Sequence, residues 1–449
     1  PKYQKEVCSY METLQEKSLK FNSNMVVSND GGQLSNDAGL LLLFEFLHKI
    51  KFDEMLKEFF HLNDSRAYCI HEYEDILKQL IIQLIAGYPQ DSAANRLRLD
   101  PILKQGIGKD QLASQSMISR FIHELTEENV AQFQQIAKGL ADDWIHHTNT
   151  QHMVIDIDST HSDTFGHQEH TDFNTHYGTN GYHPLVAFDG LTGLFLDARL
   201  RPGNVYTSNA AEDFLAAIIR QHKKHSCEMF LTVRGDSGFA KPEIYSLCEE
   251  EQVKYVIRLK VNHKLKDLAH HRVHYGETTD FTKDEHQYFI MDYQAGSWDI
   301  SREVAVKATR EAGNLLFTKY EFIVTNFHGL SAETLFKLYQ KRGTMENCIK
   351  EIKNGFSFDK TDSSTYVANQ ARMMMSCIAY NLVHLMKEAT FPKEMKRSTI
   401  STIRFKLFHI AGRLTNHARQ LRVRLASSHV FDSLFWEVLE NIQSLVLLH

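Results

Sequence analysis

The sequence has no excess of positive charge, no cysteine framework and no long apolar run. Its formal net charge is −6 over 449 residues, so any nucleic-acid binding must depend on local patches. The six cysteines form no C-x-x-C pair, which argues against a zinc ribbon or disulfide scaffold and is typical of reduced cytosol. The run AGLLLLFEFL is too short to span a bilayer and contains Glu45. The first residues lack the apolar stretch of a signal peptide, and we expect a cytoplasmic protein.

The composition is that of a globular protein, with 43% hydrophobic and 24% charged residues. The length allows two or three domains. Apolar residues repeat at helical spacing from residue 38 to about 150, and strands then alternate with helices over 151–261, which indicates an α/β core. A β-rich segment without clear helices follows over 262–329. Helical pattern resumes over 330–390, and a basic region completes the chain at 391–449.

One short helix of the first region has a distinctive polar face. In KDQLASQSMISRFIHELT, Ser114 or Ser116 is a plausible N-cap before an apolar set at Ile118, Phe121 and Ile122. The exposed face would present four polar residues, as the recognition helix of a helix-turn-helix does: Gln115, Ser116, Ser119 and Arg120. The alternative is a packing helix with a polar outer face.

Acidic residues interrupt two apolar strands. Asp156 and Asp158 lie in VIDIDST with a spacing that aims both at one face of the strand, and Asp236 ends the strand in FLTVRGDSGF. A carboxylate on a buried strand is costly unless it is paired or bound to a cation. Carboxylates that converge from separate elements form a hard oxygen site suited to Mg²⁺ or Mn²⁺. The alternative is that these acids cap turns or pair with arginines, as Asp236 would with Arg234.

A third acid lies on a helical stripe of mixed charge in YQKRGTMENCIKEIK. At ~100° per residue, Tyr339, Arg342, Glu346 and Lys353 would share a wedge of roughly 60° on one helix. Glu351 would lie about 140° from Glu346 and off this wedge. Mixed charge makes the wedge a poor core stripe, so it is predicted to face something other than the core.

These motifs resemble those of the IS4 group of DDE transposases, and the IS1380 family in particular. The stripe matches the Y-x-x-R-x-x-x-E-x-x-x-x-x-x-K signature, and further matches occur in the family's order along nearly the whole chain: GGQLSNDAGLLLL, LASQSMISRF, DIDST, GYHPLVAFD, LRPGN, RGDSGFAKPEIYSLCE and NQARMMMSCIAYNL. The resemblance implies an RNase H-like core formed by 151–261 and 330–390, interrupted by the β-rich insertion 262–329. The helical region 1–150 would bind DNA ends, and the C-terminal region 391–449 would be helical and basic.

The resemblance also assigns roles to the residues. Asp158, Asp236 and Glu346 would be the catalytic acids and hold Mg²⁺, for which Mn²⁺ would substitute, and Asp156 remains a rival for the first acid. Tyr339, Arg342 and Lys353 would hold the DNA backbone. Trp298 in the insertion would stack on a flipped base, with a core tryptophan as the alternative.

The activity implied is that of an insertion-sequence transposase. It would bind terminal inverted repeats as double-stranded DNA, cleave them and transfer the strands to target DNA in a cut-and-paste manner. A homodimer on DNA is expected, in the cytoplasm and associated with the nucleoid when bound. One alternative is a domesticated, non-cleaving DNA-binding regulator. Another is a zinc hydrolase that uses the five histidines between residues 161 and 183, although no H-x-x-x-H helix occurs there.

The C-terminal region carries a basic run without a matching number of acids. Between Lys393 and Arg424, nine basic residues face a single acid, Glu394. Apolar residues such as Phe405 and Phe408 are interleaved with them, which indicates a folded basic surface with a phosphate backbone as its natural partner.

Overall fold

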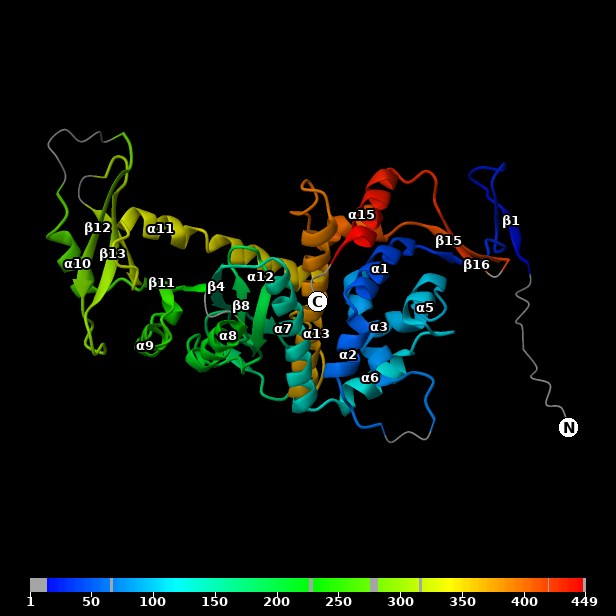
Figure 1. Cartoon of the computed structure of the whole chain (residues 1–449), viewed down its shortest axis with the longest axis horizontal. Helices are drawn as coiled ribbons and strands as arrows, with labels where there is room; N and C mark the ends of the chain where they lie inside the picture. The colour runs from blue at the N-terminus through cyan, green and yellow to red at the C-terminus, as the bar shows by residue number, and fades with distance from the viewer. Residues whose placement is uncertain are drawn as a thin grey trace.

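A computed structural model describes residues 14–64, 68–225, 229–274, 282–314, 317–418 and 420–446. The molecule is elongated, with a mixed sheet at one end and a helical part at the other (Figure 1). None of the helices within these ranges is long and apolar enough to cross a membrane. Cys8 and Cys227 lie outside the described residues, and the four described cysteines are free.

The helical part contains most of the N-terminal third and several C-terminal helices. Its helices are η1 (Ala38–Leu40), α1 (Leu41–Lys49), α2 (Phe52–Phe59), α3 (Tyr73–Ala86), α4 (Ala93–Leu97), α5 (Pro101–Ile107), α6 (Gln115–Glu124), α7 (Glu127–His147), α13 (Tyr366–Thr390), α14 (Ile400–Ile403), η3 (Arg404–Phe408) and α15 (Asp432–Ser444). The helical periodicity predicted for residues 38 to 150 is therefore confirmed.

The central sheet has the strand order β12-β13-β14-β11-β10-β4-β8-β9. Its strands are β4 (His152–Ser159), β8 (Leu185–Asp189), β9 (Phe195–Arg199), β10 (Phe230–Gly235), β11 (Lys254–Leu259), β12 (Glu285–Tyr293), β13 (Arg302–Arg310) and β14 (Thr318–Thr325). β4, β10 and β11 are parallel neighbours, while β8 and β9 continue the sheet antiparallel on one side and β14, β13 and β12 on the other. The α/β alternation predicted for 151–261 is confirmed.

Helices of the sheet-bearing half connect and flank these strands. They are α8 (Ala211–His225), η2 (Ser237–Phe239), α9 (Pro242–Glu250), α10 (His263–His270), α11 (Ala332–Gln340) and α12 (Gly343–Phe356). The expectation that 262–329 has no clear helix is wrong at α10. The Asn262 side chain caps this helix by accepting from the Leu265 N–H, and Leu265 and Ala269 are its buried residues. Its three apolar residues, Leu265, Leu268 and Ala269, have helical spacing, but three positions in eight residues are too short a pattern to predict a helix with certainty.

Three smaller sheets lie outside the central one. Their strands are β1 (Glu16–Ser18) with β2 (Val26–Ser28), β5 (Ser162–Asp163) with β7 (Thr179–Tyr182) and β6 (Asp172–Asn174), and β3 (Leu34–Ser35) with β15 (Gly412–His417) and β16 (Gln420–Leu425). The basic C-terminal region is thus only partly helical, which corrects the sequence expectation. In QLRVRL apolar and polar side chains alternate with period two, and this pattern favours a strand.

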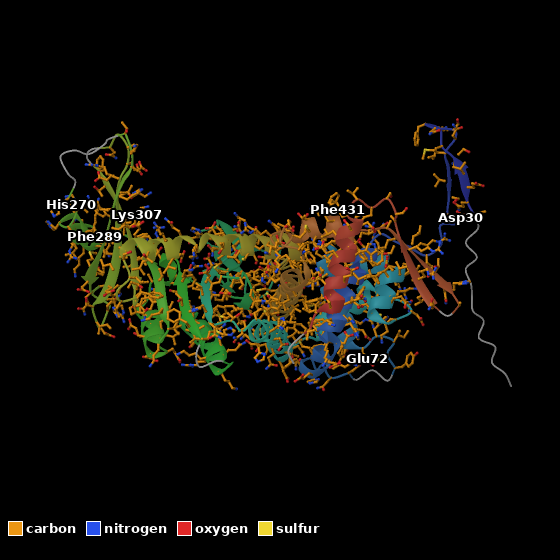
Figure 2. All side chains as sticks on the ribbon, turned by 45° about the horizontal axis from the view of Figure 1, so that its top comes forward. Asp30, Glu72, His270, Phe289, Lys307 and Phe431 are labelled. Carbon is orange, nitrogen blue, oxygen red and sulfur yellow. The ribbon has the colours of Figure 1, made fainter. Side chains whose placement is uncertain are left out.

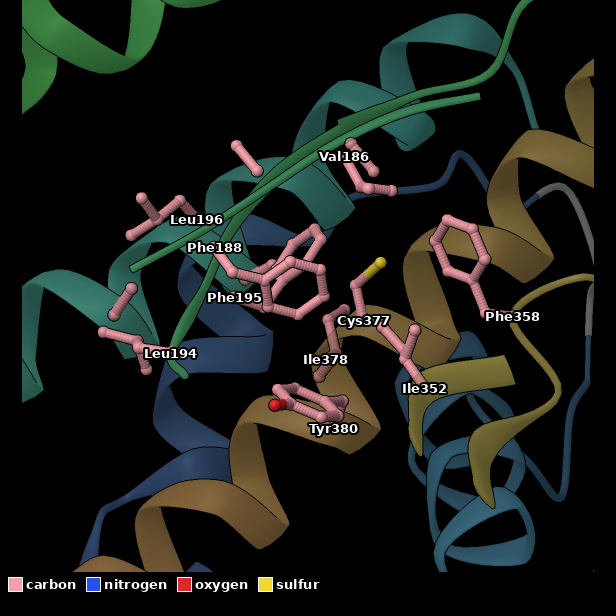
Figure 3. Close-up of a cluster of buried hydrophobic side chains, with 14 of the residues drawn as sticks. Val186, Phe188, Leu194, Phe195, Leu196, Ile352, Phe358, Cys377, Ile378 and Tyr380 are labelled. Atoms are coloured by element: carbon pink, nitrogen blue, oxygen red, sulfur yellow. The ribbon is translucent and has the colours of Figure 1, made fainter. Parts of the chain in front are cut away.

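The sheet and the helical part share one hydrophobic core. Phe188 of β8 and Phe195 of β9 pack edge to face, with ring centroids 5.5 Å apart, and Figure 3 shows them facing Ile378 and Tyr380 of α13. Ile352 of α12 joins the same cluster. The three methionines at 373–375 are buried on α13. This packing holds α12 next to the sheet, and α12 carries the predicted third acid.

Candidate active site

Asp158 and Asp236 meet because β4 and β10 are parallel and in register. The pairing aligns Arg234 with Asp156, so two residues further along the strands Asp236 reaches the level of Asp158. Neighbouring strands lie ~4.8 Å apart. Asp158 is the second-to-last residue of β4. Asp236 is the N-cap of η2, and its Oδ1 accepts a hydrogen bond from the Gly238 N–H at 2.8 Å. Two carboxylates therefore share one edge of the sheet.

Asp158 is held by an arginine of the predicted signature. Its Oδ2 lies 2.8 Å from Nη2 of Arg342, and the Ser159 N–H donates to its Oδ1 at 2.9 Å. Burial raises the pKa of Asp158, Arg342 lowers it, and the nearby charge of Asp236 raises it. The Nε of Arg342 is buried without a hydrogen-bond partner among the described residues. Arg342 is therefore the positively charged side chain beside Asp158, and its Nε–H is available to donate a hydrogen bond.

Asp156 has a different environment from Asp158. It is fully buried, and Arg234 binds it in a fork, Nε to Oδ1 and Nη2 to Oδ2, both at 2.6 Å. The remaining nitrogen, Nη1 of Arg234, donates to the Leu338 carbonyl at 2.7 Å. Burial raises the pKa of Asp156 to about 6, although Arg234 lowers it. A Cβ at Gly190 would lie 2.2 Å from Asp156 Oδ2, so only glycine fits over this ion pair.

The signature stripe is not on one continuous helix. Tyr339 lies on α11, a turn at 341–342 follows, and α12 begins at Gly343 with Arg342 as its N-cap. Lys353 on α12 donates to the His161 carbonyl at 2.8 Å, which brings it to the loop that follows β4. Burial raises the pKa of Tyr339, and Asp236 is among the groups that affect it.

Glu346 does not form a three-carboxylate cluster with Asp158 and Asp236. It is exposed and lines a pocket with Arg258, Tyr339 and Arg342. Within the described residues, no three or more His, Cys, Asp or Glu side chains are grouped so as to hold a metal ion. Glu351, its competitor on the same helix, accepts from the Ile400 N–H at 2.6 Å, so its carboxylate is used in joining α12 to α14.

Two hard oxygen donors nevertheless fit a divalent cation. Asp158 and Asp236 are both partly exposed, and the charge of Asp236 makes ionisation of Asp158 more difficult. A cation between them would relieve this repulsion and supply the ligand type that Mg²⁺ and Mn²⁺ prefer. Glu346 would need to turn toward this edge to become a third ligand.

Sequence reasoning missed Tyr177, which follows β6. Its ring stacks on His161, with centroids 4.7 Å apart and planes 18° apart, and His176 meets it edge on at 4.8 Å. Tyr177 is 43% exposed. The charges of Asp158 and Asp236 raise the pKa of Tyr177, after the larger effect of burial. The histidine-rich segment therefore supports a tyrosine near the two carboxylates, and the clustering of its histidines was the available signal.

The remaining predicted residues lie away from this edge. On α6, Gln115, Ser116 and Arg120 are exposed and Ser119 is half-buried, while the apolar set predicted for its inner face is buried. The N-cap position belongs to Ser114. Trp298 is only 6% exposed and packs edge on against Tyr245 and Tyr293, each at 5.4 Å between ring centroids.

Two carboxylates at adjacent strand ends, with Arg342 beside them, have the donor chemistry of a site for a divalent cation. Residues 17–447 match the family described as Transposase DDE domain group 1. The match covers nearly the whole chain, and the chain belongs to this family.

Solved structures of transposases are also similar to the chain, at low identity. A piggyBac transposase synaptic complex with hairpin DNA is 10% identical with a TM-score of 0.41, covering 97% of this chain and 85% of that one. A Mos1 mariner paired-end complex with Mn is 12% identical with a TM-score of 0.17, covering 50% of this chain and 72% of that one. No curated protein matches the chain.

Proposed function

We propose that this transposase binds the terminal inverted repeats of its own element, cleaves them with a bound divalent metal and joins the ends to target DNA by cut and paste. The observation that carries the proposal is the pair Asp158 and Asp236 at one sheet edge, with Arg342 beside them. Asp158 and Asp236 would hold Mg²⁺ or Mn²⁺, which would supply activation of a water or a 3′-hydroxyl and stabilisation of the leaving oxygen. The family membership and the motif order support placement among IS1380-type elements.

The topology supports an RNase H-like core. The order β9-β8-β4-β10-β11, with the first three strands antiparallel and the last three parallel, is the arrangement expected for that fold. On this reading the acids occupy β4 and the end of β10, and the third comes from the helix α12. The strands β12 to β14 extend the sheet between the second and third acids, where the insertion was predicted.

Three acids would hold the metal, and three other residues would position the DNA. Asp158 is the first acid, because the carboxylate of Asp156 is already bound in full by Arg234. Asp236 is the second and Glu346 the third, after its side chain turns to the metal. Arg342, Lys353 and Tyr339 hold the phosphates next to the scissile bond, and Arg342 has an unused Nε donor for this purpose.

Other contacts follow from the same reading. The exposed polar face of α6, with Gln115, Ser116, Ser119 and Arg120, is proposed to read the terminal repeat. Two ends must be held together for cut-and-paste transposition, so a homodimer on DNA is expected. Trp298 would need to leave its aromatic packing before it could stack on a base.

The test is cleavage of a duplex that carries the DNA flanking the gene, with Mg²⁺ or Mn²⁺ added. Asp236→Asn and Glu346→Gln should each reduce strand cleavage by roughly 10²–10³-fold, the scale of losing one group that stabilises charge in the transition state. End binding in a mobility-shift assay should stay close to that of the unchanged protein. Glu351→Gln on the same helix is the matched control, because glutamine keeps the acceptor for the Ile400 N–H, and it should cleave normally.

The outcomes separate the transposase from its alternative. Wild-type cleavage by either acid variant would contradict the site assignment. If the unchanged protein binds the ends but never cleaves them with either metal, the chain is a DNA-binding regulator derived from a transposase instead.

A further inference from the structure

The hairpin β15–β16 has two unlike faces. Residues that pair directly across an antiparallel ladder share a face, and the register pairs Leu414 with Val423 and Gly412 with Leu425. Leu414 is 7% exposed, and Val423 and Leu425 are half-buried. Because side chains alternate along a strand, this arrangement leaves other side chains to solvent on the opposite face.

That opposite face carries three arginines. Arg413 pairs across the ladder with Arg424, and Thr415 pairs with Arg422. Arg422 and Arg424 are two residues apart and therefore on the same side, roughly 6.6 Å from each other along the strand. All three arginines are exposed. We refer to Arg413, Arg422 and Arg424 as the arginine face.

The arginine face has no counter-charge within the described residues. None of these three guanidinium groups makes an ion pair or a side-chain hydrogen bond with a residue in the described ranges, and the sequence from 412 to 425 contains no acid. Arg413 lies directly opposite Arg424, and like charges directly opposite in a ladder destabilise it. The hairpin thus carries a cost in the free protein that an external anion would relieve.

The position of the hairpin suits a large anion. Figure 1 shows β15 and β16 at the end of the helical part, away from the central sheet and next to β1. Figure 2 shows the same separation from another side, with Asp30 at this end of the molecule and Phe289 and Lys307 at the other. A ligand bound here would lie beyond the reach of Asp158 and Asp236, so it must be long if it also reaches the sheet edge.

We infer that the arginine face binds the phosphate backbone of duplex DNA at a distance from the cleavage site, so that one DNA segment contacts both ends of the molecule. This inference rests on the proposed function, since it assigns a second contact to the same DNA. Double-stranded DNA carries one charge per ~1.7 Å of axis, so three guanidinium groups spaced by a few ångströms each meet a phosphate oxygen. Backbone contacts carry no sequence information, and the arginine face therefore strengthens binding to all duplexes alike.

The experiment measures the salt dependence of binding to a 40-base-pair duplex of random sequence by fluorescence anisotropy, with the full chain and no metal. Each phosphate contact contributes about −0.9 to the slope of log K against log salt. Neutralising the arginine face with Arg413→Gln, Arg422→Gln and Arg424→Gln together should make the slope less negative by about 2.7. The same variant should melt at or above the temperature of the unchanged protein, since a like-charge pair has been removed.

Two controls keep the result specific. The triple variant Lys51→Gln, Lys57→Gln and Lys224→Gln removes the same charge from exposed positions outside the hairpin and should leave the slope within about 0.5 of the original. Lysine at all three positions of the arginine face keeps the charge and should restore most of the slope.

Each outcome bears on a different proposal. An unchanged slope in the glutamine variant, with intact folding, overturns the role of the arginine face. If the glutamine variant loses more of its salt slope on duplex RNA than on duplex DNA, the arginine face binds RNA, and the proposed DNA contact is wrong. If the unchanged protein binds no duplex DNA at low salt, the proposed function itself fails.

Discussion

The contrast between Asp156 and Asp158 gives the sharpest test of the site. The two acids are two residues apart on the same strand, yet Asp156 is fully buried in a forked ion pair with Arg234, and Asp158 is partly exposed beside Arg342. Changing each acid to asparagine removes one charge and almost no volume. The two variants should therefore fail in opposite ways.

Asp156→Asn should destabilise the fold. It leaves the guanidinium of Arg234 buried without its counter-charge, and breaking a buried pair in this way costs about 3–5 kcal/mol. The loss is set by desolvation, because the side chain of Arg234 is 3% exposed. Urea unfolding followed by circular dichroism should show the midpoint fall by the equivalent of that free energy.

Asp158→Asn should leave the fold nearly unchanged and abolish cleavage. Its partner Arg342 has 12% of its side chain exposed and Asp158 has 19%, and the charge of Asp236 opposes ionisation of Asp158. Loss of the carboxylate therefore removes an attraction and a repulsion together, and we expect the urea midpoint to fall clearly less than in Asp156→Asn. The end-cleavage assay should show no product.

The double variant Asp156→Leu with Arg234→Met is the control for the first experiment. Replacing a buried ion pair by apolar residues is often neutral, so it should recover part of the lost stability. Recovery should be incomplete, because the Leu338 carbonyl loses the donor Nη1 of Arg234. If Asp156→Asn keeps wild-type stability and Asp158→Asn still cleaves DNA, the assignment of Asp158 as the first acid is wrong.

Three further predictions concern other groups. Arg342→Gln should bind Mn²⁺ more tightly than the unchanged protein in the absence of DNA, measured by electron paramagnetic resonance, because the guanidinium no longer competes for Asp158; equal affinities would contradict this. Tyr177→Phe should slow cleavage severalfold. The melting temperature should not change, since Tyr177 is partly exposed and the phenylalanine ring keeps the stacking on His161. A wild-type cleavage rate would exclude a role for the hydroxyl. Burial lowers the pKa of His384 from 6.5 to about 3. Between these pH values the unfolded chain binds more protons than the folded protein, so the free energy of unfolding falls as the pH drops below 6.5, by about 2 kcal/mol at pH 5. His384→Phe should therefore show a smaller decrease in urea midpoint between pH 7 and pH 5 than the unchanged protein.

The sequence predicts the elements better than the contacts between them. Apolar periodicity identifies the long helices and the strands that carry the acids, because each of these patterns is local. The choice between Asp156 and Asp158 is not local. It depends on the parallel register that aligns Arg234 with Asp156, whereas the sequence alone suggested Asp236 as the partner of Arg234. The same limit applies at 341–342, where a turn divides the predicted single helix.

The placement of Arg342 explains how this site is stable before metal and DNA arrive. Two partly buried carboxylates on neighbouring strands repel each other, and the guanidinium beside Asp158 offsets that repulsion. A divalent cation bound by Asp158 and Asp236 would take over this role with a larger charge. Arg342 would then be free to donate to a phosphate oxygen, for which its planar guanidinium is well suited. On the proposed function, metal binding and the phosphate contact would be coupled through this one side chain, and Glu346, which is exposed in the free protein, would complete the site once metal and DNA are bound.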